Sequence, residues 1–233
     1  MRSTVTNMSL QKTSDIEIIY EDKYITVCRK PVGMLSEDVQ GGEKGIIGLL
    51  SDRAGKPMHL LHRLDRNVGG VMVFANDKKS ASKMSEDIRE NRLKKEYIAV
   101  TDGIPAAERG EYKDLLFKDS HKNRSYVVNR MRKGVKDASL EYEVIGKTAD
   151  KAMVRVLLHT GRTHQIRVQF SSRKTPLTGD IKYGSKDRTN GDIALHSYRI
   201  TFKHPITGEQ MVYSCEPDHS VYPWSLFGGD EDA

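Results

Sequence analysis

Apolar and polar residues alternate along several short stretches of this chain, the pattern expected of strands with one buried face. Residues 16–20 and 24–28 are two β-rich runs separated by Glu21-Asp22-Lys23, and they predict a hairpin. The alternation returns at residues 140–144 and 194–202, where the second run leads through a turn at 205–208 to another strand at 211–215. The second half of the chain is therefore predicted to be rich in antiparallel strands.

Two other patterns complete the predicted elements. Residues 71–75 and 153–158 are mainly apolar runs of strand length, and the first is expected to be a central strand covered on both sides. Ala81, Met84 and Ile88 recur at helical spacing among polar residues, residues 46–50 begin a short helix, and residues 97–101 return to a strand. The sequence thus predicts an α+β fold with a mostly antiparallel sheet, not alternating βαβ units.

Length and composition limit the class of protein. The 233 residues correspond to one large domain or two small lobes, which we place at residues 15–227. Residues 1–14 read as a disordered polar leader and 228–233 as a disordered acidic tail. No apolar run approaches the roughly 20 residues of a membrane-spanning helix. The first fifteen residues carry no secretory signal, and two cysteines cannot form a disulfide framework, so we expect a cytoplasmic location.

Positive charge is concentrated in one segment. The chain has a formal net charge of +6, and residues 118–136 alone hold seven basic residues against one acid, Asp119. Charge alone leaves a solvated surface and a nucleic-acid contact equally open. The basic residues proposed as RNA contacts in this segment are Lys122, Arg124, Arg130, Arg132 and Lys133.

The first polar cluster beside a predicted core strand is His62-Arg63-Leu64-Asp65-Arg66, which a glycine pair follows at 69–70. A carboxylate between two arginines stays ionised and can act as a nucleophile. An ordinary salt bridge within a loop is the alternative interpretation.

A second polar cluster occupies residues 160–167, directly after the predicted strand 153–158. It is expected to form a pocket wall that includes Arg162 and Arg167, or else a capped surface loop. Its secondary structure is open, because Ile166, Val168 and Phe170 fit one face of a strand, whereas Thr163 could cap a short helix.

Other chemistries find little support. The pairs His59/His62 and His159/His164 lack further ligands at metal-site spacing, so we expect no metal. The glycine pairs lack the following Lys-Ser/Thr of a phosphate-binding loop, so no nucleotide cofactor is expected. Neither cysteine has a recognisable histidine partner for thiol catalysis.

The two polar clusters, taken in order with their flanks, resemble the RluA-type family of RNA pseudouridine synthases. The resemblance rests on Lys30-Pro31-Val32-Gly33, the 62–66 cluster, Lys95-Glu96-Tyr97, the 161–167 cluster, Gly179-Asp180 with Tyr183-Gly184, and Leu195-His196 with His204-Pro205. It covers residues 16–217. It implies a bent, mostly antiparallel mixed sheet in two lobes, with peripheral helices and a central cleft.

The resemblance also implies roles for individual residues. Asp65 matches the catalytic aspartate that forms a covalent adduct, Tyr97 the tyrosine that stacks on the target base, and Arg167 the basic partner of the aspartate. Arg63 matches an arginine that helps to displace the flipped nucleotide, and Leu195 an apolar pocket residue. The target uridine must leave its stack to be reached. The sequence does not settle which group removes the C5 proton, for which Tyr97 is one candidate.

The implied reaction isomerises uridine to pseudouridine in structured ribosomal or transfer RNA, needs no cofactor, and is expected of a monomer. Asn67-Val68-Gly69 departs from the family's aspartate-threonine-serine, and we expect no S4 RNA-binding domain before residue 16. Two other functions stay open at this point. One is an RNA-binding protein on the same fold without catalysis, and the other is a glycosidase or nucleosidase, which would need a second catalytic carboxylate.

Overall fold

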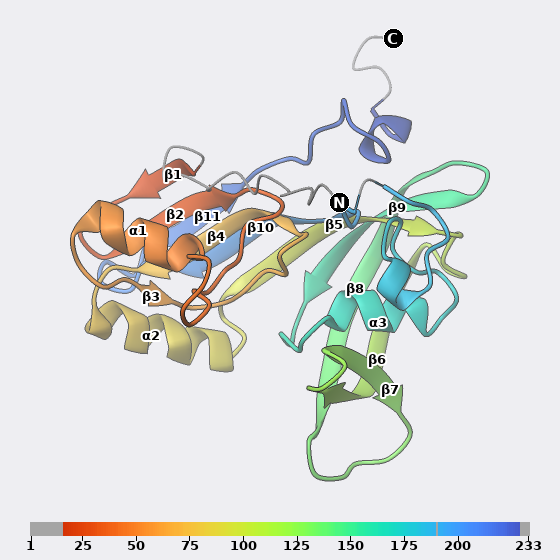
Figure 1. The fold of residues 1–233 in the computed structure, drawn as a ribbon, viewed down its shortest axis with the longest axis horizontal. Coiled ribbons are helices and arrows are strands. Elements are labelled where there is room, and N and C mark those ends of the chain that lie inside the picture. Colours follow the sequence, from red (N-terminus) through yellow and green to blue (C-terminus); the bar gives the residue numbers. More distant parts are fainter. Residues whose placement is uncertain (1–15, 190, 229–233) are drawn as a thin grey trace, which may run out of the picture.

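The computed structural model describes residues 16–189 and 191–228 of the chain. The predicted leader and most of the predicted acidic tail lie outside the described residues. Within them, eleven strands form one continuous sheet whose main path runs β1-β2-β4-β10-β5-β9-β8-β6-β7. Figure 1 shows two groups of elements, or lobes, and strand β5 runs between them.

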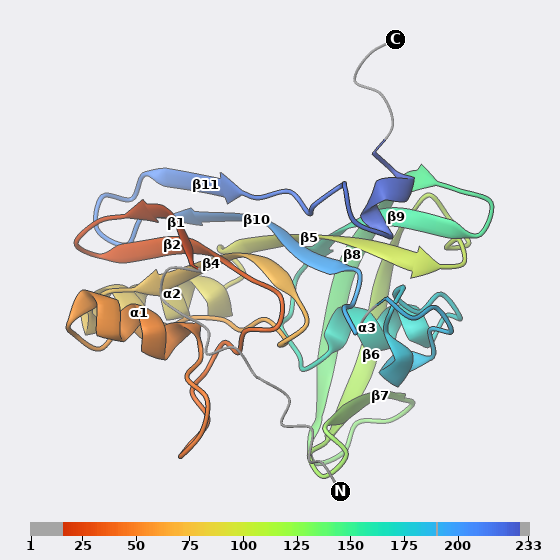
Figure 2. The same cartoon turned by 45° about the horizontal axis from the view of Figure 1, so that its top comes forward.

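The first lobe contains the hairpin of β1 (Glu17–Glu21) and β2 (Ile25–Lys30), the helices α1 (Ile46–Ala54) and α2 (Lys78–Arg89), and strands β3 (His59–Leu60) and β4 (Gly69–Ala75). The C-terminal hairpin of β10 (Leu195–Lys203) and β11 (Gln210–Ser214) returns to this lobe (Figure 2). Every residue of β4 is buried, as predicted for a covered central strand.

The second lobe continues the sheet beyond β5 (Lys94–Asp102). It consists of β6 (Arg109–Asp119), β7 (Arg124–Val128), β8 (Val135–Lys147), β9 (Lys151–Leu158), and the helix α3 (Gln165–Ser171). Short 3₁₀ turns occupy Ile181–Tyr183 and Trp224–Leu226. Strands β6, β7 and β8 extend away from the rest of the molecule as an arm (Figure 1).

All strand pairs are antiparallel except β4 with β10, which run parallel for two residue pairs. At this pairing the backbones approach closely, because a Cβ at Gly70 would lie 2.2 Å from the carbonyl oxygen of Ser197. Gly70 also has a φ of +120°, which a residue with a side chain rarely adopts. Glycine is therefore required immediately behind the loop that carries Asp65.

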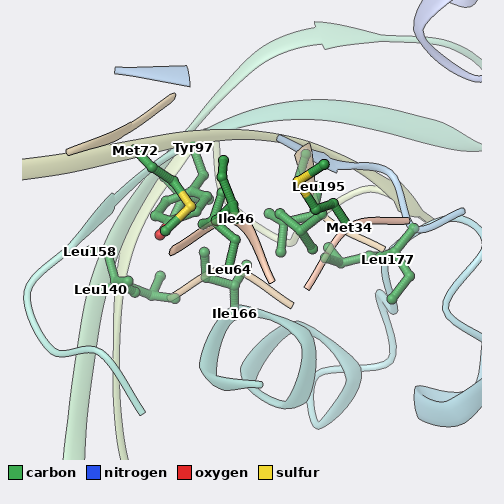
Figure 3. Close-up of a cluster of buried hydrophobic side chains, with 14 of the residues drawn as sticks. Met34, Ile46, Leu64, Met72, Tyr97, Leu140, Leu158, Ile166, Leu177 and Leu195 are labelled. Atoms are coloured by element: carbon green, nitrogen blue, oxygen red, sulfur yellow. The ribbon is translucent and has the colours of Figure 1, made fainter. Parts of the chain in front are cut away.

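One hydrophobic cluster joins the two lobes. It combines Ile46 and Leu50 of α1 with Met72 and Phe74 of β4 and with side chains of β5, β8, β9 and α3. Figure 3 shows Leu64 and Ile166 in this cluster. Each of them directly precedes a candidate site residue in the sequence, Asp65 and Arg167 respectively. A second cluster holds Val71 and Val73 with Met84 of α2 and the C-terminal hairpin. The loop that carries Asp65 and the helix that carries Arg167 therefore pack into the same hydrophobic core.

Helix α3 is held on the sheet largely by Phe170. Its fully buried ring makes edge contacts with the rings of Tyr112 and Tyr142, with centroids 5.1 and 5.6 Å away. Such aromatic contacts add to the free energy gained by burying the ring.

We therefore expect Phe170→Ala to lower the free energy of unfolding by about 3–5 kcal/mol, because it leaves a cavity under α3. Urea denaturation measures the change. Val212→Ala serves as the control, since this side chain on β11 is 52% exposed, and its removal should change stability by about 0.5 kcal/mol or less. Equal effects of the two substitutions would contradict the assignment.

Candidate functional site

Asp65 lies in the loop between β3 and β4, and backbone contacts fix this loop on both sides. The hydroxyl of Ser36 donates to the Leu64 carbonyl at 2.8 Å and accepts from the Leu64 N–H at 3.0 Å. The carbonyl of Asp65 itself accepts the Val68 N–H at 3.0 Å. The side chain of Asp65 is 31% exposed, so its carboxylate is held in place yet open to a ligand.

Lys30, fully buried at the end of β2, binds backbone carbonyls of the turn that follows β2 and of the loop that carries Asp65. Its ammonium donates to the carbonyls of Pro31, Met34 and Arg66 at 2.9, 2.7 and 3.3 Å. Burial lowers the pKa of Lys30, while the charge of Asp65 acts in the opposite direction. The lysine of the 30–33 motif therefore positions the backbone immediately after Asp65.

Arg167 of α3 connects Asp65 with a second carboxylate. Its Nη1 donates to Asp65 Oδ2 at 2.6 Å, while Nε and Nη2 donate to Asp180 Oδ2 and Oδ1 at 2.6 and 2.9 Å. Asp180 is 1% exposed. Burial alone would disfavour the charge, but the two carboxylates raise the pKa of Arg167 above its usual value. Asp65 Oδ1 has no hydrogen-bond partner among the described residues.

The arginines adjacent to Asp65 in the sequence do not hold it. Arg63 Nη1 pairs with Glu37 at 2.5 Å, and Arg66 Nη2 pairs with Glu43 at 2.6 Å, both at the surface. The expectation that Asp65 is paired with the arginines on either side of it is wrong. Side chains of successive loop residues point in different directions, and the cation on Asp65 comes from Arg167, 102 residues away.

The cluster at 160–167 forms a turn that leads into α3, which resolves its open secondary structure in favour of the helix. The side chain of Gln165 accepts from the Arg162 N–H at 3.1 Å and from the Thr160 hydroxyl at 2.7 Å. Thr163 is not the cap, because His164 precedes the helix in a left-handed conformation with a φ of +54°. This turn aims Arg167 toward Asp65.

Tyr97 and Leu195 both lie in the cluster that joins the lobes (Figure 3). Burial, with the charge of Asp65, raises the pKa of the Tyr97 phenol. Leu195 also lines a cavity of about 400 Å³ between β2, the 189–196 segment and the C-terminal segment. Asp65, Tyr97 and Arg167 do not line this cavity, and the central cleft expected beside them stays a prediction.

Tyr183 connects the site with the basic segment. Its hydroxyl accepts from the Ser125 N–H at 2.8 Å and lies 3.0 Å from His164 Nδ1. The guanidinium carbons of Arg124 and Arg167 lie 5.0 and 5.1 Å from the centre of its ring. Segment 118–136, which forms the end of the β6–β7–β8 arm, is therefore connected through Tyr183 to the arginine that holds Asp65.

The remaining predicted RNA contacts surround this attachment. Lys122, Arg130, Arg132 and Lys133 are exposed, and Arg124 is half-buried. No basic side chain of segment 118–136 forms a salt bridge within the described residues, whereas Arg63 and Arg66 both do. Arg162 lies beside the arm, where its Nε donates to the Asp137 carbonyl at 2.8 Å.

The histidine pairs have structural partners. His62 Nε2 accepts the Val73 N–H at 3.2 Å, and burial lowers the pKa of His62 to about 3. His159 Nε2 lies 2.8 Å from Glu141 Oε1. Burial lowers the pKa of His164 to about 4, so its contact with Asp65 at 3.8 Å involves a neutral ring at pH 7. Among the described residues, no three His, Cys, Asp or Glu side chains are grouped to hold a metal ion.

Three positioning residues were not among the predicted site residues. Lys30, Asp180 and Tyr183 all stand in motifs that carry the family resemblance, and that position is the signal that could have identified them. Their roles depend on contacts between distant segments.

Within the described residues, no helix combines the length and apolar character needed to cross a membrane.

Comparison with known proteins places this geometry in a family. The family model for RNA pseudouridylate synthase matches residues 24–172. An uncharacterized RNA pseudouridine synthase of Bacillus subtilis is 30% identical over 85% of this chain and 67% of its own length. Ribosomal large subunit pseudouridine synthase D of Neisseria meningitidis serogroup A is 30% identical over 89% of this chain and 59% of the relative.

A solved structure agrees. The human RNA pseudouridylate synthase domain containing 4 superimposes with a TM-score of 0.70 and 26% identity, covering 87% of this chain and 89% of that one. The chain spans about three fifths to two thirds of the length of the curated relatives described above. The fold and the family expected from the motifs are confirmed: the chain belongs to the RNA pseudouridylate synthase family.

Proposed function

We propose that this protein isomerises uridine to pseudouridine in structured RNA, with Asp65 as the nucleophile. The observation that carries the proposal is the asymmetric environment of the Asp65 carboxylate. Arg167 holds Oδ2 at 2.6 Å, while Oδ1 has no hydrogen-bond partner among the described residues. One oxygen is thus oriented, and the other is available to form a bond.

The reaction needs no oxidant and no external group. The bond between C1′ and N1 of the target uridine breaks, the base turns, and a bond forms between C1′ and C5. N1 gains a proton and C5 loses one, so atoms and electrons balance. Asp65 forms a transient covalent bond to the target nucleotide, and this bond breaks again before the product leaves, so the carboxylate is regenerated.

Tyr97 is proposed to contact the extruded base. Its buried ring offers an aromatic face, and stacking of this kind stabilises a base by roughly 1–3 kcal/mol. Because the pKa of its phenol is raised, the hydroxyl stays protonated at neutral pH. This supports stacking by Tyr97 in the resting site more than removal of the C5 proton.

Ribosomal RNA is the proposed substrate, because two relatives are named ribosomal large subunit pseudouridine synthases. The unpaired basic side chains of segment 118–136 suit contact with the RNA backbone, which dominates the affinity of such complexes. A cytoplasmic location suits the two free cysteines, Cys28 and Cys215. The monomeric state stays a prediction.

The first test of the proposal is Asp65→Asn. We expect this variant to release no tritium from RNA labelled at uridine C5, because the amide cannot form the adduct, while wild type releases it. Unmodified large-subunit ribosomal RNA and transfer RNA are assayed separately to identify the substrate class. Release by the variant would exclude Asp65 as the nucleophile. Activity of wild type on free uridine alone would favour a nucleosidase instead.

Asp180→Asn tests the support of Arg167. Removing one partner of a buried ion pair leaves charge uncompensated, so we expect the free energy of unfolding to fall by about 3–5 kcal/mol. Tritium release should fall as well, since Arg167 loses the partner that orients it. Glu86→Gln is the control, because it removes an exposed partner of Lys83 and should cost about 1 kcal/mol or less. Unchanged stability and activity in Asp180→Asn would contradict this role.

Charge reversal tests the basic segment. Replacing Arg130, Arg132 and Lys133 with Glu should weaken RNA binding and reduce the slope of log affinity against log salt by about 0.9 for each lost phosphate contact. The matched control reverses Lys56, Lys78 and Lys79, which are exposed in the first lobe. Binding is measured by fluorescence anisotropy between 50 and 200 mM salt, the range in which such contacts are most visible. If both triple variants behave alike, the segment has no specific role.

A further inference from the structure

Lys95 is a buried lysine of strand β5 that has no role in the proposed mechanism. Side chains alternate along a strand, so Lys95, Tyr97 and Ala99 share one face, and the last two belong to the cluster that joins the lobes. Lys95 is 9% exposed. Its neighbour Lys94 lies on the opposite face of the strand and is half-buried.

The ammonium group of Lys95 lies beside one of the two segments that carry the site. A Cβ built on Gly161 would be 3.4 Å from Lys95 Nζ, which places the ammonium beside the turn that leads to Arg167. The positive charge of Lys95 also contributes to the lowered pKa of His62, three residues before Asp65. Lys95 Nζ therefore lies beside the turn that leads into α3.

Comparison with the other buried lysines shows what Lys95 lacks. Three lysines are buried in the described part of the chain. Lys30 donates to three carbonyls, and Lys151 lies 2.7 and 2.9 Å from carboxylate oxygens of Asp102 and Asp187. Lys95 makes neither a hydrogen bond nor a salt bridge with any described residue. Burial accordingly lowers its pKa.

An ammonium that loses most of its water and gains no acceptor destabilises the folded protein. A site of this kind is complete only when a ligand brings the acceptor, and the acceptor that best matches a lysine is an anionic oxygen. His62, the titratable group facing Lys95 from the loop before Asp65, is neutral and cannot compensate the charge. RNA supplies phosphate oxygens at every nucleotide.

We propose that Lys95 is a phosphate-binding residue of the site, which donates to a backbone phosphate of the RNA segment that carries the target uridine. The inference rests on the proposed function. Lys95 contacts the substrate strand from inside the boundary of the lobes, whereas segment 118–136 contacts RNA from the outer arm. A phosphate held beside the turn that leads to Arg167 would fix the backbone while the base is extruded.

The test compares Lys95→Met with Lys94→Met, a control on the same strand whose side chain points to the other face. Both are made in the Asp65→Asn background, so that binding is measured without turnover. The probe is unmodified large-subunit ribosomal RNA transcribed in vitro, titrated at several salt concentrations. Loss of one charge-assisted contact should raise the Kd roughly tenfold and reduce the salt slope by about 0.9. Lys94→Met should leave both values close to those of its parent.

Thermal unfolding supplies a readout that separates binding from a structural role. Methionine removes an uncompensated buried charge, so Lys95→Met should unfold at the same or a higher temperature than its parent. Lys95→Arg, which keeps the charge, should retain the salt slope. A lower unfolding temperature with an unchanged slope would make Lys95 a structural residue and overturn the proposal, as would an equal change of slope in Lys94→Met.

The catalytic assay distinguishes failure of this inference from failure of the proposed function. With Asp65 restored, Lys95→Met should raise the KM for tritium release more than it lowers kcat. Release by wild type with no change of KM or salt slope in Lys95→Met would overturn the phosphate site alone. Absence of release by wild type from both ribosomal and transfer RNA would overturn the proposed function, while the salt slopes would still decide whether Lys95 binds phosphate.

Discussion

The site depends on one buried guanidinium. Arg167 spans the boundary of the lobes and binds two carboxylates, Asp65 from the first lobe and Asp180 from the second. Asp180 is almost completely buried and takes two of the three hydrogen bonds, so it fixes the guanidinium in the fold. Asp65 takes one hydrogen bond and is 31% exposed. The same arginine can therefore stay anchored through Asp180 while Asp65 changes its bonding during a reaction.

Positive charge is distributed differently around Asp65 and in segment 118–136. In the first lobe, surface arginines near Asp65 pair with glutamates, so they add little net charge. In segment 118–136, the basic side chains have no carboxylate partner within the described residues, and the net charge of the segment equals that of the whole chain. If the arm binds RNA as proposed, the RNA backbone meets its strongest attraction there, away from the carboxylate that would repel it.

Much of the fold could be predicted from the sequence, because alternation and helical spacing report directly on burial. The strands at 71–75 and 194–202 and the helix around Met84 follow such patterns. Strands β6 and β7 were not predicted, since charged residues interrupt them and few of their residues are buried. Asp65 and its partner Arg167 were identified through family motifs, whereas the sequence pattern alone suggested a role for the flanking Arg63 and Arg66, which pair with glutamates instead. Nearness in sequence does not determine where a loop side chain points, and the contacts of Lys30 and Asp180 join segments that only the fold brings together.

The contact through Tyr183 explains how a fixed arm can contribute to the choice of target. The ring lies against Arg124 of the arm and Arg167 of the site, and its hydroxyl accepts from the backbone of Ser125. The surface that we propose binds backbone phosphates is thereby held at a set distance and orientation from Asp65. Contacts to phosphates carry no base sequence, so they select RNA by shape. Under the proposed function, a uridine would be modified only if the folded RNA presented it at Asp65 while its backbone rested on the arm, so this rigid connection would turn RNA shape into specificity.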